Sequence, residues 1–152
     1  MEKLSPRVDR VVKLANQIAR EYEQEYVGTE HVLLAIAREG SGVGARILHH
    51  CQLDEAHIKD EVDKLIKASL EDTWVFGRLP GSPHFKNVVA KAIEEARGLG
   101  SKTVCTEHLL LGLLAEKGCV AQRSLKALGL TARQVREEIM RLMSESRLSP
   151  DA

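Results

Sequence analysis

Apolar residues recur every three or four positions along most of this chain, which is the period of an amphipathic α-helix. In the segment 6–22 they form one stripe made of Val8, Val11, Val12, Ala15, Ile18, Ala19 and Tyr22. The segment 83–99 repeats the register with Phe85, Val88, Val89, Ala92, Ile93, Ala96 and Leu99. Each segment follows a Ser-Pro pair, and Ser suits the N-cap while Pro suits the first helical position. The pattern therefore predicts a helix in each segment.

The rest of the chain predicts three further pairs of helices. They are expected after Thr29 and Thr106, over 42–50 and 119–127, and after Asp54 and Thr131. The first pair is apolar almost all round, which is typical of a central helix. The last pair carries stripes that we expect to face inward, namely Ile58, Val62, Leu65 and Ile66, and Val135, Ile139, Leu142 and Met143. No segment alternates apolar and polar residues over the length of a strand, so we predict an all-α fold.

The predicted helices fall into two sets of four because the sequence repeats itself. A shift of 77 positions aligns 5–67 with 82–144 without a gap, and 20 of the 63 pairs are identical. Unrelated segments of ordinary composition would share about four. We therefore expect a tandem duplication, packed as a single domain, a pseudo-twofold bundle of eight helices over 1–152. Its expected parts are repeat one (5–67), a linker (68–81), repeat two (82–144) and a flexible tail (145–152), with Trp74, Val75 and Phe76 of the linker folded back onto the helices.

Composition narrows the class of protein. Lys and Arg total 22, as do Asp and Glu, so the net charge is zero and the basic footprint of a nucleic-acid binder is missing. No apolar run approaches the roughly 20 residues that span a bilayer, and the first ten residues contain no apolar signal-peptide core. Cys51, Cys105 and Cys119 are odd in number and widely spaced, so we expect buried thiols in a reducing compartment. These features predict a soluble cytoplasmic protein that binds neither nucleic acid nor membrane.

The triplet Thr-Glu-His precedes an apolar run twice, at 29–31 and at 106–108. One interpretation is a helix start, in which Thr29 and Thr106 cap free backbone N–H groups and the glutamates occupy the positive first turn. That interpretation does not account for His31 and His108, because many polar residues would serve there. A metal site would need further ligands one turn later, where only leucines stand. The third interpretation is a pair of surface carboxylates, Glu30 and Glu107, that bind a cationic group such as a guanidinium.

Other candidate chemistry is weak. The run His49-His50-Cys51 suggests zinc, but repeat two has Lys126, Ala127 and Leu128 at these positions, so solvated histidines beside one core cysteine are expected. The glycine run at 40–44 follows a predicted helix instead of a strand and lacks the Gly-Lys-Ser/Thr ending of a phosphate-binding loop. All three cysteines lie in or beside apolar stretches, where thiols are inert. We predict no catalytic residues, no metal and no cofactor.

The two four-helix repeats carry a shared motif, Thr-Glu-His-(Val/Leu)-Leu-Leu followed by Glu-x-x-x-Val. This doubled motif resembles the Clp N-terminal domain, the substrate- and adaptor-binding module of the ClpC/ClpA class of AAA+ unfoldases. The stretch GRLPGSPHFKNVVAKAIEEARGLG is similar to the join between repeats in ClpC-type members. The resemblance covers about 5–144. It implies a module that recruits client proteins or adaptors for ATP-dependent proteolysis, with Clp unfoldase or protease components as partners.

The resemblance also implies a ligand. In some ClpC-type members, the Glu of each Thr-Glu-His binds the guanidinium of phosphoarginine on marked proteins, which points here to Glu30 and Glu107, beside Thr29, His31, Thr106 and His108. Cys105 stands where the family usually has Gly, so we expect it to crowd the second site. The chain has no AAA+ nucleotide-binding motif, so we expect either a domain excised from a longer protein or a free-standing adaptor, decoy or accessory subunit of a Clp machine. The alternative to phosphoarginine recognition is a free-standing accessory subunit that docks on the Clp protease core or unfoldase without it.

Overall fold

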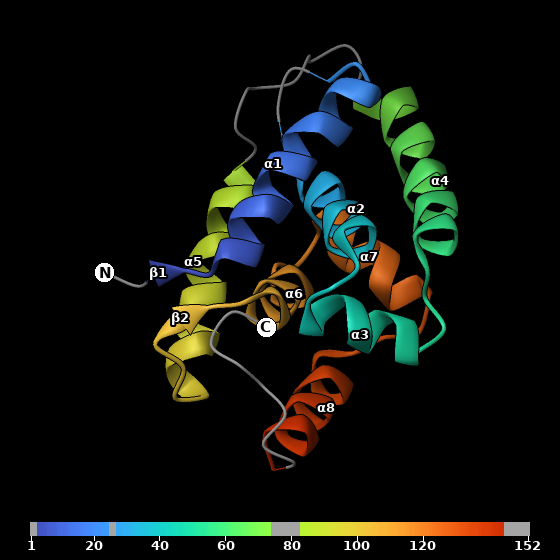
Figure 1. The fold of residues 1–152 in the computed structure, drawn as a ribbon. Coiled ribbons are helices and arrows are strands. Elements are labelled where there is room, and N and C mark those ends of the chain that lie inside the picture. Colours follow the sequence, from blue (N-terminus) through green and yellow to red (C-terminus); the bar gives the residue numbers. More distant parts are fainter. Residues whose placement is uncertain (1–2, 25–26, 74–82, 145–152) are drawn as a thin grey trace.

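The computed structural model describes residues 3–24, 27–73 and 83–144. Within these residues the chain forms eight helices and one pair of very short strands, so the all-α prediction is confirmed (Figure 1). In chain order the elements are β1 (Lys3–Leu4), α1 (Pro6–Glu21), α2 (Thr29–Glu39), α3 (Val43–His50), α4 (Glu55–Thr73), α5 (Pro83–Gly98), β2 (Thr103–Val104), α6 (Thr106–Ala115), α7 (Val120–Ala127) and α8 (Ala132–Ser144).

The helices begin where the sequence predicts because their caps are local. The Ser5 hydroxyl accepts a hydrogen bond from the backbone N–H of Val8 at 3.1 Å, and Asp54 accepts one from that of His57 at 2.9 Å. Before α8, the Thr131 hydroxyl accepts from the N–H of Gln134, whose side chain accepts in return from the N–H of Thr131. Reciprocal bonds of this kind form a capping box.

Helices α2 and α6 lie at the centre of the molecule, with α1 and α5 on one side and α3, α4 and α7 on the other (Figure 1). Residues 29–36 and 106–113 are all buried, which is why these helices are apolar almost all round. The α5–α6 contact is close: a Cβ added to Gly112 would lie 2.6 Å from the Val88 carbonyl oxygen. The core is therefore built around the second helix of each repeat.

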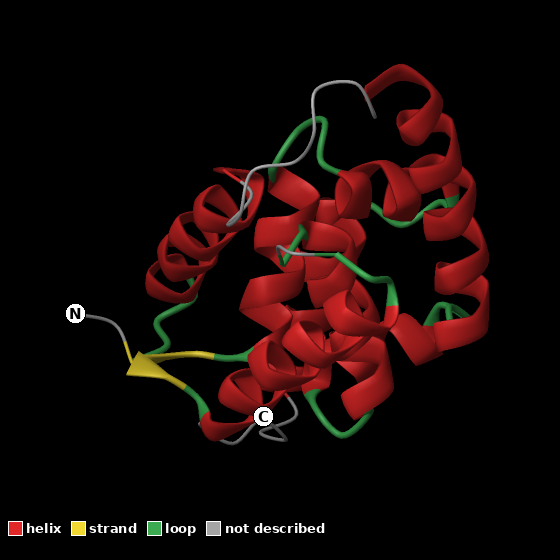
Figure 2. Ribbon diagram, turned by 90° about the horizontal axis from the view of Figure 1, so that it is seen from above, coloured by secondary structure: helices red, strands yellow, loops and turns green. Residues whose placement is uncertain are grey.

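The two strands pair in parallel at the edge of the helical body (Figures 1 and 2), with Lys3 opposite Thr103 and Leu4 opposite Val104. The backbone N–H of Ser5 extends the pairing by donating to the carbonyl of Val104 at 2.9 Å. Since β1 leads into α1 and β2 leads into α6, the pairing holds the N-termini of these two helices side by side. Two-residue strands have no periodicity, so the sequence could not predict them.

Helix α4 runs to Thr73, past residue 68, where the predicted linker begins. Two other expectations were wrong. Met143 was expected to face inward but is 41% exposed, so the inward stripe of α8 stops at Leu142. Met140, three positions before it, is 57% exposed. Cys51 is exposed, whereas Cys105 and Cys119 are buried as expected. The expected positions of Trp74, Val75, Phe76 and the tail lie outside the described residues, and the division into repeats, linker and tail stays a prediction.

Candidate functional site

The two Thr-Glu-His triplets open the central helices, as predicted, but threonine is not the cap. The N-caps are Gly28 and Cys105, and Thr29 and Thr106 are the first helical residues of α2 and α6. Both caps have extended backbone, with φ and ψ of −99° and 172° at Gly28 and −107° and 174° at Cys105. The two copies therefore share one backbone conformation.

Each threonine hydroxyl caps a helix of the other repeat. Thr106 Oγ1 accepts from the N–H of Gly44, in the first turn of α3, at 2.9 Å. Thr29 Oγ1 accepts from the N–H of Ala121, in the first turn of α7, at 3.2 Å. These bonds satisfy donors that a helix N-terminus leaves open, and both are buried. The expected cap thus exists, but it joins the two repeats instead of closing its own helix.

The histidines have a role that the sequence analysis missed. His31 Nδ1 accepts from the N–H of Gly28 at 2.8 Å, and His108 Nδ1 accepts from the N–H of Cys105 at 2.9 Å. Histidine here takes the place of the Glu or Gln of an ordinary capping box. Burial lowers the pKa of His108 to about 4, although the charge of Glu95 opposes the change, so its ring is neutral at neutral pH. A neutral ring is what Nδ1 needs in order to accept.

The glutamates are not on the surface, which corrects the prediction of surface carboxylates. Glu30 is 4% exposed and Glu107 is 3% exposed. Their surroundings differ. The Glu30 carboxylate lies against Gly28, so close that a Cβ on the glycine would be 2.3 Å from Oε1. Glu107 Oε1 is buried and has no hydrogen-bond partner in the part of the chain that the structure describes. Burial raises the pKa of Glu107 to about 7, against the opposing effects of its own backbone N–H and the charge of Arg7.

Arg7 is a candidate site residue that the sequence analysis did not single out. The β1–β2 pairing brings the start of α1 beside that of α6, and the Arg7 charge acts on Glu107. Its Nε donates to the Ser41 hydroxyl at 3.0 Å, and that hydroxyl donates to Glu39 at 2.6 Å. The N-termini of α1, α3 and α6 meet here, because a Cβ on Gly42 would lie 2.5 Å from Thr106 Oγ1 and 3.1 Å from Arg7 Cδ. The only sequence signal was that its counterpart one repeat later, His84, is also basic.

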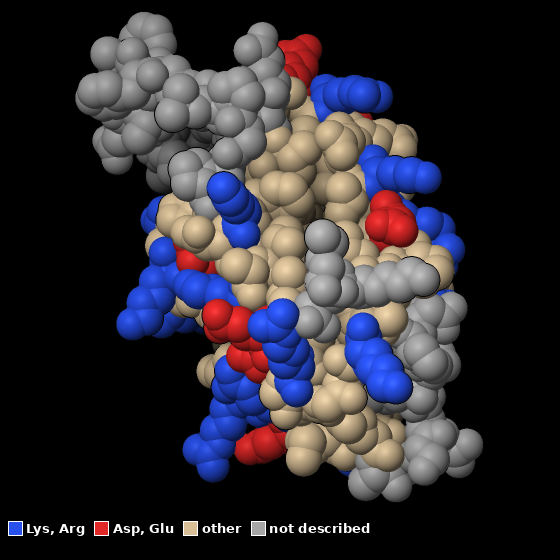
Figure 3. All heavy atoms as spheres, turned by 90° about the vertical axis from the view of Figure 1, so that its left-hand side faces the viewer, with Lys and Arg blue, Asp and Glu red and all other residues tan. Residues whose placement is uncertain are grey.

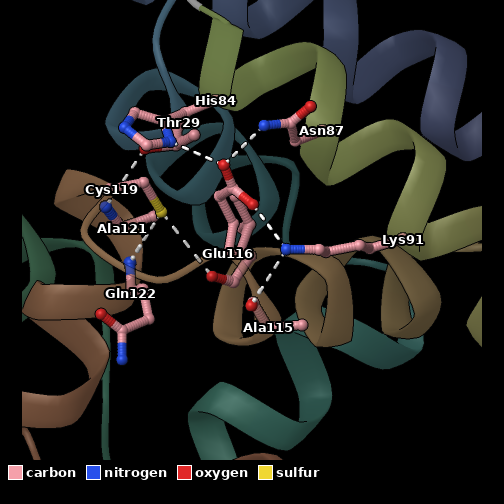
Figure 4. A network of polar contacts seen from close by, with 10 residues as sticks. Thr29, His84, Asn87, Lys91, Ala115, Glu116, Cys119, Ala121 and Gln122 are labelled. Atoms are coloured by element: carbon pink, nitrogen blue, oxygen red, sulfur yellow. Dashed lines mark hydrogen bonds and ion pairs between the residues drawn. The ribbon is translucent and has the colours of Figure 1, made fainter.

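The corresponding corner of repeat two is closed by ion pairs. Glu116, the counterpart of Glu39, accepts from Lys91 at 2.6 Å and from Asn87 at 2.9 Å, and His84 lies 2.6 Å away (Figure 4). Burial of this carboxyl favours its neutral form, but these three partners outweigh burial and lower the pKa of Glu116 to about 2. In Figure 4 the network adjoins the start of α7, where Thr29 accepts from Ala121. His84 is therefore already paired with a carboxylate.

One group of potential metal donors occurs among the described residues. Donor atoms of Cys105, Glu107 and His108 lie within 4.8 Å of one another. However, the Nδ1 lone pair of His108 already accepts from the Cys105 backbone, so Nε2 carries the proton of this neutral ring. Coordination would break that cap or require the other tautomer. The donor set does not favour a metal.

Lys and Arg prevail among the charged side chains on the face that carries β1, β2 and α5, where they flank an uncharged strip (Figure 3).

A hollow of about 260 Å³ lies between α1, α2 and α4, and its floor includes Ile18 and Leu34. The charges at its rim are paired, since Arg38 binds both Glu21 and Glu55 at 2.9 Å. Among the described helices, none has the length and apolar character that a membrane crossing needs.

Comparison with known proteins shows which family and which proteins this chain is similar to. The family described as Clp repeat (R) N-terminal domain matches residues 3–128 and again 81–148. The chloroplast chaperone protein ClpC1 of Oryza sativa is 35% identical over 145 residues, which cover 95% of this chain and 16% of the rice protein. The chaperone protein ClpB of Oceanobacillus iheyensis is 35% identical over 144 residues, covering 95% of this chain and 17% of the bacterial protein. The chain thus spans about a sixth of the length of these relatives.

Solved structures agree on the fold. The N-terminal domain of the chaperone ClpD from Arabidopsis thaliana superposes with a TM-score of 0.69 at 20% identity, covering 92% of this chain and 97% of that one. The N-terminal domain of Hsp104 from Candida albicans gives 0.71 at 13% identity, covering 99% and 97%. Some relatives are chloroplastic, so the predicted cytoplasmic location stays a prediction.

Proposed function

Because the chain belongs to the family of Clp repeat N-terminal domains, we propose that it is a non-enzymatic binding module of the Clp protease system. Its partners would be client proteins, adaptors, and the Clp unfoldase or protease components to which it delivers them. The similarity of nearly the whole chain to the ClpC1 and ClpB chaperones supports this assignment. Neither nucleic acid, membrane nor cofactor enters the proposal.

The ligand we assign to the Thr-Glu-His elements is phosphoarginine on a client. The observation that carries the assignment is the corner where Arg7 and three helix N-termini meet beside the buried carboxyl of Glu107. A guanidinium would supply the partner that Glu107 Oε1 lacks, in a charge-assisted bond. Arg7 and the positive ends of the three helix dipoles would favour the phosphate. One zwitterionic group would thus satisfy both halves of the corner.

Calorimetric titration with free phosphoarginine tests this function. We expect saturable binding to the wild type, with arginine and inorganic phosphate as separate controls that each offer only half of the contacts. Glu30→Gln and Glu107→Gln keep the side-chain volume but remove the negative charge, and the variant at a working site should lose binding. Equal, unsaturable heats in the wild type and both variants would refute the phosphoarginine assignment.

A second candidate is an accessory subunit that docks on the Clp unfoldase or protease core without reading phosphoarginine. It is favoured by the burial of Glu30 and Glu107, 4% and 3% exposed, and by the structural use of their Thr and His neighbours as caps. In that case the same Gln variants would co-elute with purified Clp components as the wild type does. Loss of co-elution in either variant would argue against it.

A further inference from the structure

The guanidinium of Arg7, at the corner beside Glu107, is held by a chain of two hydrogen bonds. Arg7 Nε donates to the Ser41 hydroxyl at 3.0 Å, and that hydroxyl donates to Glu39 Oε2 at 2.6 Å. Both bonds run in one direction, from the cation to the carboxylate, so each polarises and strengthens the other. Ser41 is therefore a link between two charged side chains.

Glu39 fixes Ser41 at a second point. Its Oε1 accepts from the backbone N–H of Ser41 at 3.0 Å, and its side chain is only 10% exposed although Ser41 itself is exposed. Burial alone would raise the pKa of Glu39, but the two bonds from Ser41 and the charges of Arg10 and Arg7 outweigh burial and lower it. Glu39 is thus an ionised anchor that orients the Ser41 hydroxyl.

The backbone around Ser41 brings this chain of bonds to the corner. Gly40 ends α2 with a φ of 75°, in the left-handed region that favours glycine. A Cβ on Gly42, the N-cap of α3, would lie 2.5 Å from Thr106 Oγ1 and 3.1 Å from Arg7 Cδ. A side chain at residue 42 would therefore push the loop away from Arg7 and from the start of α6.

Repeat two has no such link. The counterpart of Ser41 is Gly118, which has no hydroxyl, and Glu116 contacts His84, the counterpart of Arg7, directly at 2.6 Å (Figure 4). A carboxylate in direct contact with a cation competes with an anionic ligand for that cation. In repeat one the neutral Ser41 hydroxyl takes the contact at Nε instead, and a guanidinium held through Nε turns its Nη groups to a ligand.

We propose that Ser41, anchored by Glu39, is a positioning residue that holds Arg7 by Nε and aims its Nη groups at the phosphate of a ligand bound to Glu107. Ser41 does not touch the ligand and acts only through Arg7. This inference rests on the proposed phosphoarginine function.

The binding test is calorimetric titration of the wild type, Ser41→Ala and Ser41→Thr with phosphoarginine. Ser41→Ala removes the hydroxyl and should weaken binding by about fivefold, which is the effect expected from the loss of one hydrogen bond. Ser41→Thr is the matched control: it keeps a hydroxyl and should bind within about twofold of the wild type. Unchanged binding in Ser41→Ala, or an equal loss in both variants, would overturn the inference.

A second measurement needs no ligand and separates the two proposals. In ¹H–¹⁵N NMR spectra the Nε–H of Arg7 should exchange with solvent at least about fivefold faster in Ser41→Ala than in the wild type or Ser41→Thr, because it has lost its acceptor. If the wild type binds phosphoarginine but this exchange is unchanged in Ser41→Ala, only the positioning role fails. If exchange accelerates and the wild type binds no phosphoarginine, the proposed function fails while the hold of Ser41 on Arg7 stands.

Discussion

Replacing Glu107 with Gln should change how the stability of the protein depends on pH. Burial raises the pKa of Glu107 from 4.5 to about 7, so the folded protein holds a proton that the unfolded chain releases in this range. The free energy of unfolding must then fall as pH rises from about 4.5 to about 7. This change in pKa corresponds to about 3 kcal/mol, most of which falls between about pH 5 and about pH 8.

The neighbouring His108 has the opposite linkage and would hide this effect in the wild type alone. Burial lowers its pKa from 6.5 to about 4, so the unfolded chain holds the extra proton and the free energy of unfolding rises with pH between these values. The two contributions nearly cancel. A comparison of wild type and Glu107→Gln removes the His108 contribution, because both proteins share it.

The assay is urea unfolding followed by circular dichroism, at about pH 5 and about pH 8, for both proteins. The free energy of unfolding of Glu107→Gln minus that of the wild type should increase by about 2–3 kcal/mol from the lower to the higher pH. The constant effect of exchanging an oxygen for an amide nitrogen drops out of this double difference. A double difference below about 0.5 kcal/mol would refute the assignment of a proton to Glu107 at neutral pH.

Three other predictions concern stability and are measured by the same urea unfolding. Gly112→Ala should cost about 1–3 kcal/mol, because its Cβ would meet the Val88 carbonyl oxygen at 2.6 Å, whereas Gly98→Ala, with open space around its Cβ, should gain about 0.5–1 kcal/mol. Thr106→Val should cost about 1–3 kcal/mol, because the buried N–H of Gly44 loses its acceptor, and an equal stability in the two proteins would contradict the inter-repeat cap. The ionised Glu116 carboxylate stabilises the folded wild type by about 3 kcal/mol above about pH 4.5, because its hydrogen bonds outweigh burial and lower its pKa. The wild type should lose this free energy as pH falls from about 4.5 to about 2, and Glu116→Gln should not show that loss. A wild type and a Gln variant that lose stability in parallel over that range would rule this last prediction out.

The helices were predictable from the sequence because their signals are local. The apolar stripes place α1 and α5, and the Ser5, Asp54 and Thr131 caps bond residues three positions away. The prediction of burial failed at Met143, because burial depends on whether another part of the protein packs against the residue. Met143 continues the stripe of α8 by spacing, yet it is 41% exposed. Apolar spacing states that a residue can be buried, and only the packing partner decides whether it is.

The site was harder to predict because its bonds join residues far apart in the chain. Thr106 and Gly44 are separated by 62 positions, and Thr29 and Ala121 by 92, so a local interpretation assigned each threonine to its own helix. The duplication could still have helped, because a hydrogen bond from one repeat to the other implies an equivalent bond with the two repeats exchanged. With threonine and histidine explained as caps, the repetition of the triplet no longer argues for a ligand by itself. The glutamates are then the remaining candidates for ligand binding, and the stronger of the two is Glu107, whose buried Oε1 has no hydrogen-bond partner among the described residues.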